Sequence, residues 1–172
     1  MIDLLKVNDL DVQFPTRHGM TYAVKDVSLT LKPGEVLGLV GESGAGKSTI
    51  GNAIINLLEP PGRVTGGDIQ FQGRNLLDLT DEQMRDVRGK KIGMIFQDPQ
   101  TSLNPLMTIG AQLVETIGKA TDLTGAAAID KAVDLLSSVG ITETEARLKA
   151  YPHEFSGGMR QRVVIALALA GD

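Results

Sequence analysis

Apolar and polar residues alternate along the N-terminal part of the chain. The alternation covers residues 4–14, as one or two segments, and resumes in residues 22–31 after a polar turn. A period of two is typical of strands buried on one face, so both ranges are predicted to be strands. Residues 35–40 are almost continuously apolar, which predicts a strand buried on both faces. Shorter runs at 67–71 and 91–96 predict two further strands.

The pattern changes to a helical period in the C-terminal half. Between residues 108 and 150, apolar residues recur three or four positions apart, which predicts two helices separated at Gly125, the second ending at Gly140. A last apolar helix is predicted from Met159 to Ala170. The residues predicted to form the apolar faces are Ile109, Leu113, Val114 and Ile117 in the first helix and Ile129, Val133, Leu136 and Val139 in the second.

Start and stop signals predict shorter helices elsewhere. Residues 50–58 continue a helix that the sequence Pro-Pro-Gly at 60–62 ends. Thr80 and Gln83 fit a capping box, in which each side chain accepts a hydrogen bond from the other residue's backbone N–H. Residues 142–145 (Thr-Glu-Thr-Glu) fit the same pattern. The sequence therefore predicts a strand-rich core followed by a helical insert.

The strongest chemical signal lies between the strand predicted at 35–40 and the helix after it. Gly41-Glu42-Ser43-Gly44-Ala45-Gly46-Lys47-Ser48-Thr49 fits the phosphate-binding pattern G-x-x-x-x-G-K-[ST]. Its glycines permit a tight loop whose N–H groups surround a phosphate, and a helix N-terminus adds positive potential. We expect Lys47 to reach the β- and γ-phosphates and Ser48 to bind the Mg²⁺ between them. An accidental glycine-rich turn is the alternative, but the spacing and the setting favour a nucleoside triphosphate site.

Composition limits the classes of function. The chain has 172 residues, enough for one domain with a sizeable core, and its net charge of −4 argues against a nucleic-acid partner. It contains no cysteine, which excludes disulfides and thiolate metal sites and fits a reducing cytosol. No apolar run approaches the ~20 residues of a membrane span, and the N-terminus lacks a signal-peptide pattern. If the protein works at a membrane, we expect it to do so through partners.

Two further motifs narrow the class of phosphate-loop protein. Residues 155–162 read Phe-Ser-Gly-Gly-Met-Arg-Gln-Arg, and they place Ser156, Gly157 and Gly158 at a helix start, where N–H groups and a hydroxyl can face an anion. An ordinary helix cap is the alternative. Gln97 follows a predicted strand and can place its side-chain carbonyl on Mg²⁺ or on an attacking water, although a solvated turn residue is the alternative.

In wording and order, these motifs resemble those of ATP-binding cassette (ABC) proteins, and the resemblance runs from residue 4 to residue 170. Residues 155–162 resemble the family's signature sequence, and residues 92–105 resemble its Q-loop segment. The resemblance implies an α/β fold: a P-loop NTPase core with an antiparallel β subdomain and a helical insert, the C-terminal part of the core being absent from this sequence. The implied parts are a nucleotide-binding core at 1–98, a helical subdomain at 99–155 and a signature helix returning to the core at 156–172.

The resemblance also implies how the motifs cooperate. Two homologous subunits face each other head to tail, and the signature Ser156, Gly157 and Gly158 of one subunit cover the ATP held by the phosphate loop of the other. An aromatic ring near the end of the first strand stacks on adenine in the family. Phe14 is the better positional match and Tyr22 the second choice, and either could instead belong to the core.

Finer wording points to one branch of the family. The Q-loop segment Phe-Gln-Asp-Pro-x-x-Ser-Leu-Asn-Pro and Met159 in the signature resemble the ATPases of dipeptide and oligopeptide importers, a branch that also serves nickel and glutathione uptake. This implies transmembrane permease subunits, an extracytoplasmic substrate-binding protein and a peripheral location at the cytoplasmic face of the membrane. A soluble ABC protein of DNA repair or translation is the alternative. A small-molecule kinase or GTPase is less favoured, because no Asn-Lys-x-Asp motif is present.

The resemblance implies catalytic groups that this sequence does not contain. In the family, a strand ending in Asp-Glu and a later switch histidine follow the signature helix. The acidic residues that do not substitute for the absent Asp-Glu pair are Asp68, Asp98 and Glu154. The two histidines, His18 and His153, are expected at the solvated surface and do not replace the switch histidine. We therefore expect a fragment of a longer subunit that binds nucleotide weakly and hydrolyses little. The absent strand is also expected to leave residues 163–167 without much of their packing.

Overall fold

The computed structural model describes residues 3–17, 19–97 and 102–171. The chain divides into two compact units, Met1–Met84 and Arg85–Asp172. The three-part division into 1–98, 99–155 and 156–172 stays a prediction.

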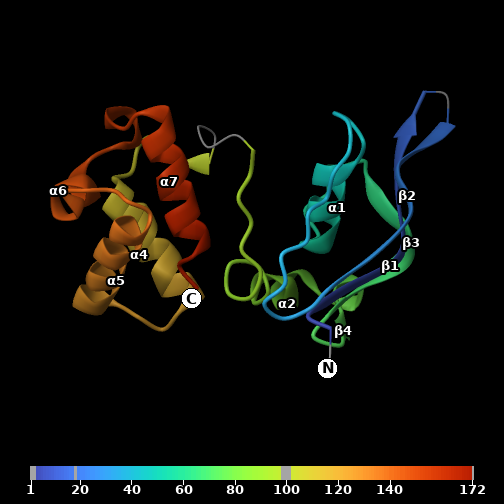
Figure 1. Ribbon diagram of the computed structural model, residues 1–172, viewed down its shortest axis with the longest axis horizontal. Coiled ribbons are helices and arrows are strands. Elements are labelled where there is room, and N and C mark those ends of the chain that lie inside the picture. The colour runs from blue at the N-terminus through green and yellow to red at the C-terminus, as the bar shows by residue number, and fades with distance from the viewer. Residues whose placement is uncertain (1–2, 18, 98–101, 172) are drawn as a thin grey trace. The chain divides into compact units, whose positions relative to one another are not determined.

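The first unit is built on an antiparallel sheet, drawn from blue to green in Figure 1. Its four strands lie in the order β2-β1-β3-β4, so β1 is paired on both sides. The prediction of a strand buried on one face is confirmed for β1, because Val7, Leu10 and Val12 are buried while their polar neighbours are not. The strands are β1 (Leu5–Thr16), β2 (Gly19–Leu31), β3 (Arg63–Phe71) and β4 (Arg74–Asn75).

Short helices complete the first unit. They are α1 (Lys47–Ile54), η1 (Leu76–Asp78) and α2 (Asp81–Arg85), the last ending at the boundary with the second unit. The capping box before α2 is confirmed, since Thr80 N donates to Gln83 Oε1 at 3.1 Å and Gln83 N to Thr80 Oγ1 at 3.3 Å. The extension of α1 to residue 58 is wrong, because Asn56 adopts a left-handed φ of 51° and ends the helical path.

The strand predicted at residues 35–40 is wrong. These residues form no strand, and Val36 and Val40 are 96% and 94% exposed. Residues 91–96 likewise form no strand beyond an isolated bridge between Arg88 and Ile92. A strand exists only when a neighbour accepts its backbone hydrogen bonds, and in the described part of the chain no strand lies beside either run. The apolar pattern therefore identifies residues that favour a strand, but it does not show whether a partner strand is present to pair with them.

The second unit is helical. Its helices, drawn from gold to red in Figure 1, are α4 (Ile109–Ala120), α5 (Gly125–Ser138), α6 (Thr144–Lys149), η2 (Pro152–Glu154) and α7 (Gly157–Ala168). The predicted face of α4 is confirmed, since Ile109, Leu113 and Ile117 are fully buried. Thr108 caps this helix, its Oγ1 accepting from Ala111 N at 3.2 Å.

Three expectations for the second unit are corrected. Helix α5 buries Ala128, Ala132, Leu135 and Leu136, so the predicted burial of Leu136 is confirmed, whereas Ile129 is 49% exposed and Val133 only half-buried. Helix α6 begins after Glu143, which has a left-handed φ of 53° and makes no side-chain cap, so the capping box at 142–145 is wrong. The residues of α7 expected to lose packing are instead in the core of this unit: Val163, Val164 and Ala166 are buried against α4 and α5.

No helix in the described ranges has both the length and the apolar character needed to cross a bilayer.

Candidate functional site

The phosphate loop lies in the first unit and leads directly into α1. Two of its glycines have left-handed backbone, Gly44 with φ +82° and Gly46 with φ +84°. Gly46 is also closely packed, since a Cβ on it would lie 2.4 Å from the carbonyl oxygen of Ala23 in β2. The loop therefore depends on glycine at position 46 for both its conformation and its contact with the sheet.

Lys47 folds back over this loop. Its Nζ donates to the carbonyl oxygens of Gly41 at 2.7 Å and Glu42 at 2.6 Å. Ala45 N donates to Glu42 O at 3.2 Å and closes a turn within the loop. The ammonium is thus held at the loop by the loop's own carbonyl groups, and the sequence motif gave no indication of these partners.

The start of α1 supplies the other electrostatic element. The first N–H groups of a helix have no partner within the helix, and the helix dipole makes this end positive. No acidic residue occupies the first turn of α1 to offset that potential. Ser48 is exposed and Thr49 is half-buried in this turn. The loop, Lys47 and the helix start together form a place suited to a multiply charged anion.

The two candidate adenine platforms lie on neighbouring strands of the same unit. Phe14 is half-buried, and a Cβ on Gly62 would lie 2.4 Å from the Cε1 and Cζ atoms of its ring, so the tip of the ring lies against Gly62. Tyr22 is 46% exposed, with the Nζ of Lys25 at 5.2 Å from its ring centroid. Both assignments stay predictions, and the structure gives each ring a partner within the protein.

The signature motif begins α7 in the second unit, as predicted. Ser156 Oγ accepts from Met159 N at 3.3 Å and caps the helix. Gly157 and Gly158 are exposed, and a Cβ on either would meet no atom within 4 Å. Space is therefore not the reason for glycine here, which is consistent with a surface that another molecule approaches.

Two arginines that the sequence argument did not single out hold this helix start in place. Arg160 Nε donates to Pro152 O at 2.8 Å. Arg162 Nη1 donates to Val139 O at 3.1 Å and to Gly140 O at 3.0 Å, where α5 ends. The last carbonyl groups of a helix have no hydrogen-bond partner within the helix. The sequence signal that could have indicated this contact was a long basic side chain, Arg162, six residues after the capping Ser156.

Gln97 is exposed at a bend in the second unit, whereas Asp98 and the following three residues lie outside the described part. The phosphate loop belongs to the first unit, and Gln97 and the signature motif belong to the second. His18 also lies outside the described residues.

The other titratable residues have local structural partners. Asp68 accepts from Asn8 Nδ2 at 3.0 and 3.2 Å, Glu154 Oε2 accepts from Tyr151 N at 2.6 Å, and the His153 ring stacks 5.8 Å from that of Tyr151. Within the described ranges, no three His, Cys, Asp or Glu side chains come together as a metal site.

Comparisons with known proteins find similar sequences. A family model described as "ABC transporter" matches residues 24–172. The oligopeptide transport ATP-binding protein OppD of Bacillus subtilis is 51% identical over 98% of this chain and 48% of its own length. The dipeptide transport ATP-binding protein DppD of the same organism is 48% identical over 98% of this chain and 51% of its own length. The chain thus spans about half the length of these relatives.

Solved structures resemble the fold as well. The ATP-binding cassette MJ0796, a dimer in a post-hydrolysis state bound to ADP and Pi, superposes with a TM-score of 0.86 at 30% identity, over 97% of this chain and 69% of that one.

Proposed function

Because the chain belongs to the ABC transporter family, we propose that it is the ATP-binding part of a subunit that powers the import of dipeptides or oligopeptides. The observation that carries the nucleotide-binding part of this proposal is the phosphate loop with Lys47 held over it at the start of α1. The OppD and DppD relatives are transport proteins by name, and they favour transport over the alternative of a soluble ABC protein.

In the proposed site, each residue has a distinct task. N–H groups of residues 41–46 and of the first turn of α1 bind the phosphate oxygens. The Lys47 ammonium leaves its two carbonyl partners and binds the β- and γ-phosphates. Phe14 stacks on adenine, with Tyr22 as the alternative platform.

We propose that Ser48 and Gln97 would hold Mg²⁺. The exposed Ser48 hydroxyl and the exposed Gln97 amide offer the hard oxygen ligands that Mg²⁺ prefers. When bound, Mg²⁺ offsets the charge of the β- and γ-phosphate oxygens.

The second nucleotide contact comes from another copy or a homologous subunit. Ser156, Gly157 and Gly158 form an exposed helix start, which would cover the γ-phosphate held by the facing subunit. MJ0796 is a dimer, which supports this arrangement for the present chain. We further propose that the dimer docks on transmembrane permease subunits at the cytoplasmic face of the membrane and acts with a substrate-binding protein.

We expect this chain to bind ATP but to hydrolyse it slowly. Asp68, Glu154 and His153 are engaged in local contacts, and we assign none of them to the activation of an attacking water. We expect the 172-residue chain to bind Mg²⁺-ATP and to turn it over far more slowly than the roughly one per second that is ordinary for enzymes of modest rate.

Calorimetry tests the binding step. Mg²⁺-ATP should release heat on mixing with the chain, and Lys47→Ala should weaken binding by about tenfold or more, since a charge-assisted contact is lost. Lys6→Ala, an exposed lysine of β1, is the control and should bind as the parent does. Equal binding by the parent chain and the Lys47→Ala variant would remove the proposal.

A further inference from the structure

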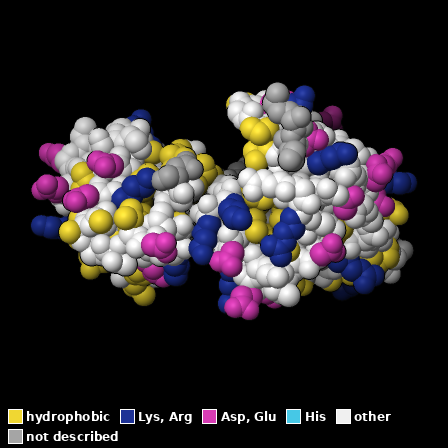
Figure 2. Space-filling view, turned by 90° about the horizontal axis from the view of Figure 1, so that it is seen from below, with side chains coloured by type: hydrophobic (Ala, Val, Ile, Leu, Met, Phe, Trp, Pro, Cys, Tyr) yellow, Lys and Arg dark blue, Asp and Glu magenta, His cyan; other side chains and the backbone are white. Residues whose placement is uncertain are grey.

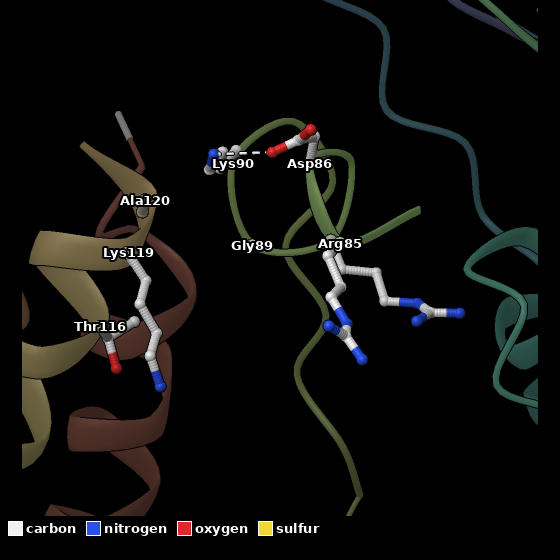
Figure 3. Close-up of a pocket in the computed structure, with 8 residues that line it drawn as sticks. Arg85, Asp86, Gly89, Lys90, Thr116, Lys119 and Ala120 are labelled. Atoms are coloured by element: carbon white, nitrogen blue, oxygen red, sulfur yellow. Dashed lines mark hydrogen bonds and ion pairs between the residues drawn. The ribbon is translucent and has the colours of Figure 1, made fainter. Parts of the chain in front are cut away.

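Arg162 binds backbone carbonyl groups, whereas several other basic side chains of the second unit pair with carboxylates. Lys90 Nζ lies 2.8 Å from Asp86 Oδ1, as Figure 3 shows, and Lys119 Nζ lies 2.6 Å from Glu115 Oε1. On the face shown in Figure 2, basic and acidic side chains are interspersed. The guanidinium of Arg162 instead donates to two carbonyl oxygens. This contact therefore connects α7 to the backbone at the end of α5.

The end of α5 is a closed and well-supported turn. Gly140 has a left-handed φ of 74°, and its N–H donates to Ser137 O at 2.9 Å. Ile141 N donates to Leu136 O at 3.0 Å, which completes the pair of bonds typical of a helix that ends at a glycine. The Ile141 side chain is buried in the core of this unit. The carbonyl groups that Arg162 binds therefore belong to a fixed piece of backbone.

The guanidinium of Arg162 occupies the space that a side chain at position 140 would take. Its Nη1 donates to Val139 O at 3.1 Å and to Gly140 O at 3.0 Å. A Cβ on Gly140 would lie 2.6 Å from the same Nη1 atom, closer than two such atoms can approach. Glycine at position 140 is therefore required twice, by the left-handed turn and by the seat of Arg162.

The same turn lies beside the start of the signature helix. The turn contributes Gly140 and Thr142, and α7 contributes Arg162, to a pocket of about 300 Å³ whose lining also includes Ser156 and Gly158 of the signature. The turn and the signature are thus separated by a hollow, and the hydrogen bonds of Arg162 connect the helix that carries the signature to the turn. Losing these bonds would free the start of α7 to shift relative to α5.

We propose that Arg162, seated on Gly140, is a positioning residue that orients Ser156 and Gly158 for the γ-phosphate of the facing subunit. The inference rests on the proposed function, in which the signature covers that phosphate. Arg162 acts through the helix start and does not itself touch the nucleotide. Hydrogen bonds weaken steeply away from their preferred distance and angle, so a small shift of α7 would weaken the contact with the phosphate.

The test compares association of two copies of the 172-residue chain in Mg²⁺-ATP and in Mg²⁺-ADP by sedimentation velocity. The parent chain should associate about tenfold more tightly with ATP, because ADP lacks the phosphate that the signature covers. Arg162→Met should lower this preference to about twofold or less, and Arg162→Lys, which keeps a donor for one carbonyl, should give an intermediate value. A general loss of stability would weaken association in both nucleotides equally and leave the preference unchanged.

A matched pair of glycine variants displaces the guanidinium without changing Arg162 or the signature. Gly140→Ala and Gly125→Ala both replace a glycine with left-handed φ, 74° and 59° respectively. Only the Cβ at position 140 meets the guanidinium, whereas a Cβ on Gly125 would have no atom within 4 Å. Gly140→Ala should therefore lower the preference for ATP and Gly125→Ala should keep it. Lys149→Met, which removes an exposed positive charge from the same unit, should also keep it.

Calorimetry with Mg²⁺-ATP separates failure of this inference from failure of the proposed function. A parent chain that binds no Mg²⁺-ATP overturns both. A parent chain that binds Mg²⁺-ATP but associates equally in ATP and ADP overturns the inference alone. So does an unchanged preference in folded Arg162→Met, or an equal loss in the Gly125→Ala or Lys149→Met control.

Circular dichroism identifies variants that do not fold. If Arg162→Met does not fold, Arg162→Lys decides: an intermediate preference for ATP supports the positioning role, and a preference equal to that of the parent chain overturns it.

Discussion

Two groups constrain the phosphate loop at the scale of single residues: the carbonyl oxygen of Ala23 and the ammonium of Lys47. The carbonyl leaves no room for a side chain at Gly46, while the ammonium joins the two ends of the loop through Gly41 and Glu42. Loop shape is therefore fixed partly by β2 and partly by the residue that is proposed to bind phosphate.

Gly46→Ala should destabilise the first unit more than Gly44→Ala. Both positions have left-handed φ, which costs a non-glycine residue about 1–2 kcal/mol. Only Gly46 also places a Cβ 2.4 Å from Ala23 O, whereas no atom lies within 4 Å of a Cβ on Gly44. Urea unfolding followed by circular dichroism should show a lower midpoint for Gly46→Ala, and equal midpoints would contradict the close contact.

At the scale of elements, α7 is positioned by contacts to the ends of its neighbours. Arg162 joins the first turns of α7 to the last carbonyls of α5, and Arg160 joins them to η2. The exposed signature glycines are therefore presented by a helix whose own start is fixed to two other elements.

Arg162→Met should loosen this attachment. Two hydrogen bonds from a charged donor are lost, and the expected loss in the free energy of unfolding is about 1–3 kcal/mol. Gln161→Met, a change at the neighbouring exposed position, is the matched control and should alter stability by less than about 0.5 kcal/mol. The measurement is urea denaturation monitored by helical circular dichroism, and similar midpoints for the two variants would refute the role of Arg162.

Ile117 and Ile129 test which faces of α4 and α5 are buried. Ile117→Ala removes a fully buried side chain and should cost about 2–5 kcal/mol, while Ile129→Ala removes one that is 49% exposed and should cost well under half as much. Thermal unfolding of both variants gives the comparison. A larger loss at Ile129 would restore the face predicted from the sequence.

The whole molecule consists of two units with separate cores, and the proposed ligands divide between them. The phosphate loop and the aromatic candidates lie in the first unit, while the signature motif and Gln97 lie in the second. Binding of nucleotide at the phosphate loop is therefore expected to raise the free energy of unfolding of the first unit.

Mg²⁺-ATP should stabilise the chain by mass action. At a hundred times its dissociation constant, a ligand that binds only the folded state contributes about 2.7 kcal/mol. The urea midpoint of the sheet unit should rise accordingly in the parent chain and rise clearly less in Lys47→Ala, by about 1.4 kcal/mol if its binding is tenfold weaker. A midpoint that rises equally in both would indicate binding outside the phosphate loop.

Local patterns were enough to predict features that depend on nearby residues. These features depend on contacts within a few residues or with one neighbouring strand. They are the alternation within β1 and β2, the buried face of α4, the capping box at Thr80 and the helix that begins after Ser156. The runs at 35–40 and 91–96 failed because a strand of a parallel sheet depends on a distant partner. The contacts of Arg160 and Arg162 were missed because they join α7 to segments elsewhere in the sequence, which a local pattern does not show.

The chain has no tryptophan, and its two tyrosines are divided between the units: Tyr22 stands on the sheet that carries the phosphate loop, and Tyr151 precedes the signature helix. Fluorinated tyrosine would therefore give one ¹⁹F resonance for each unit. Nucleotide arriving at the loop should perturb the first resonance, and a facing subunit that covers the signature should perturb the second. Nucleotide binding and association of the facing subunit could then be followed as separate changes in the same ¹⁹F spectra.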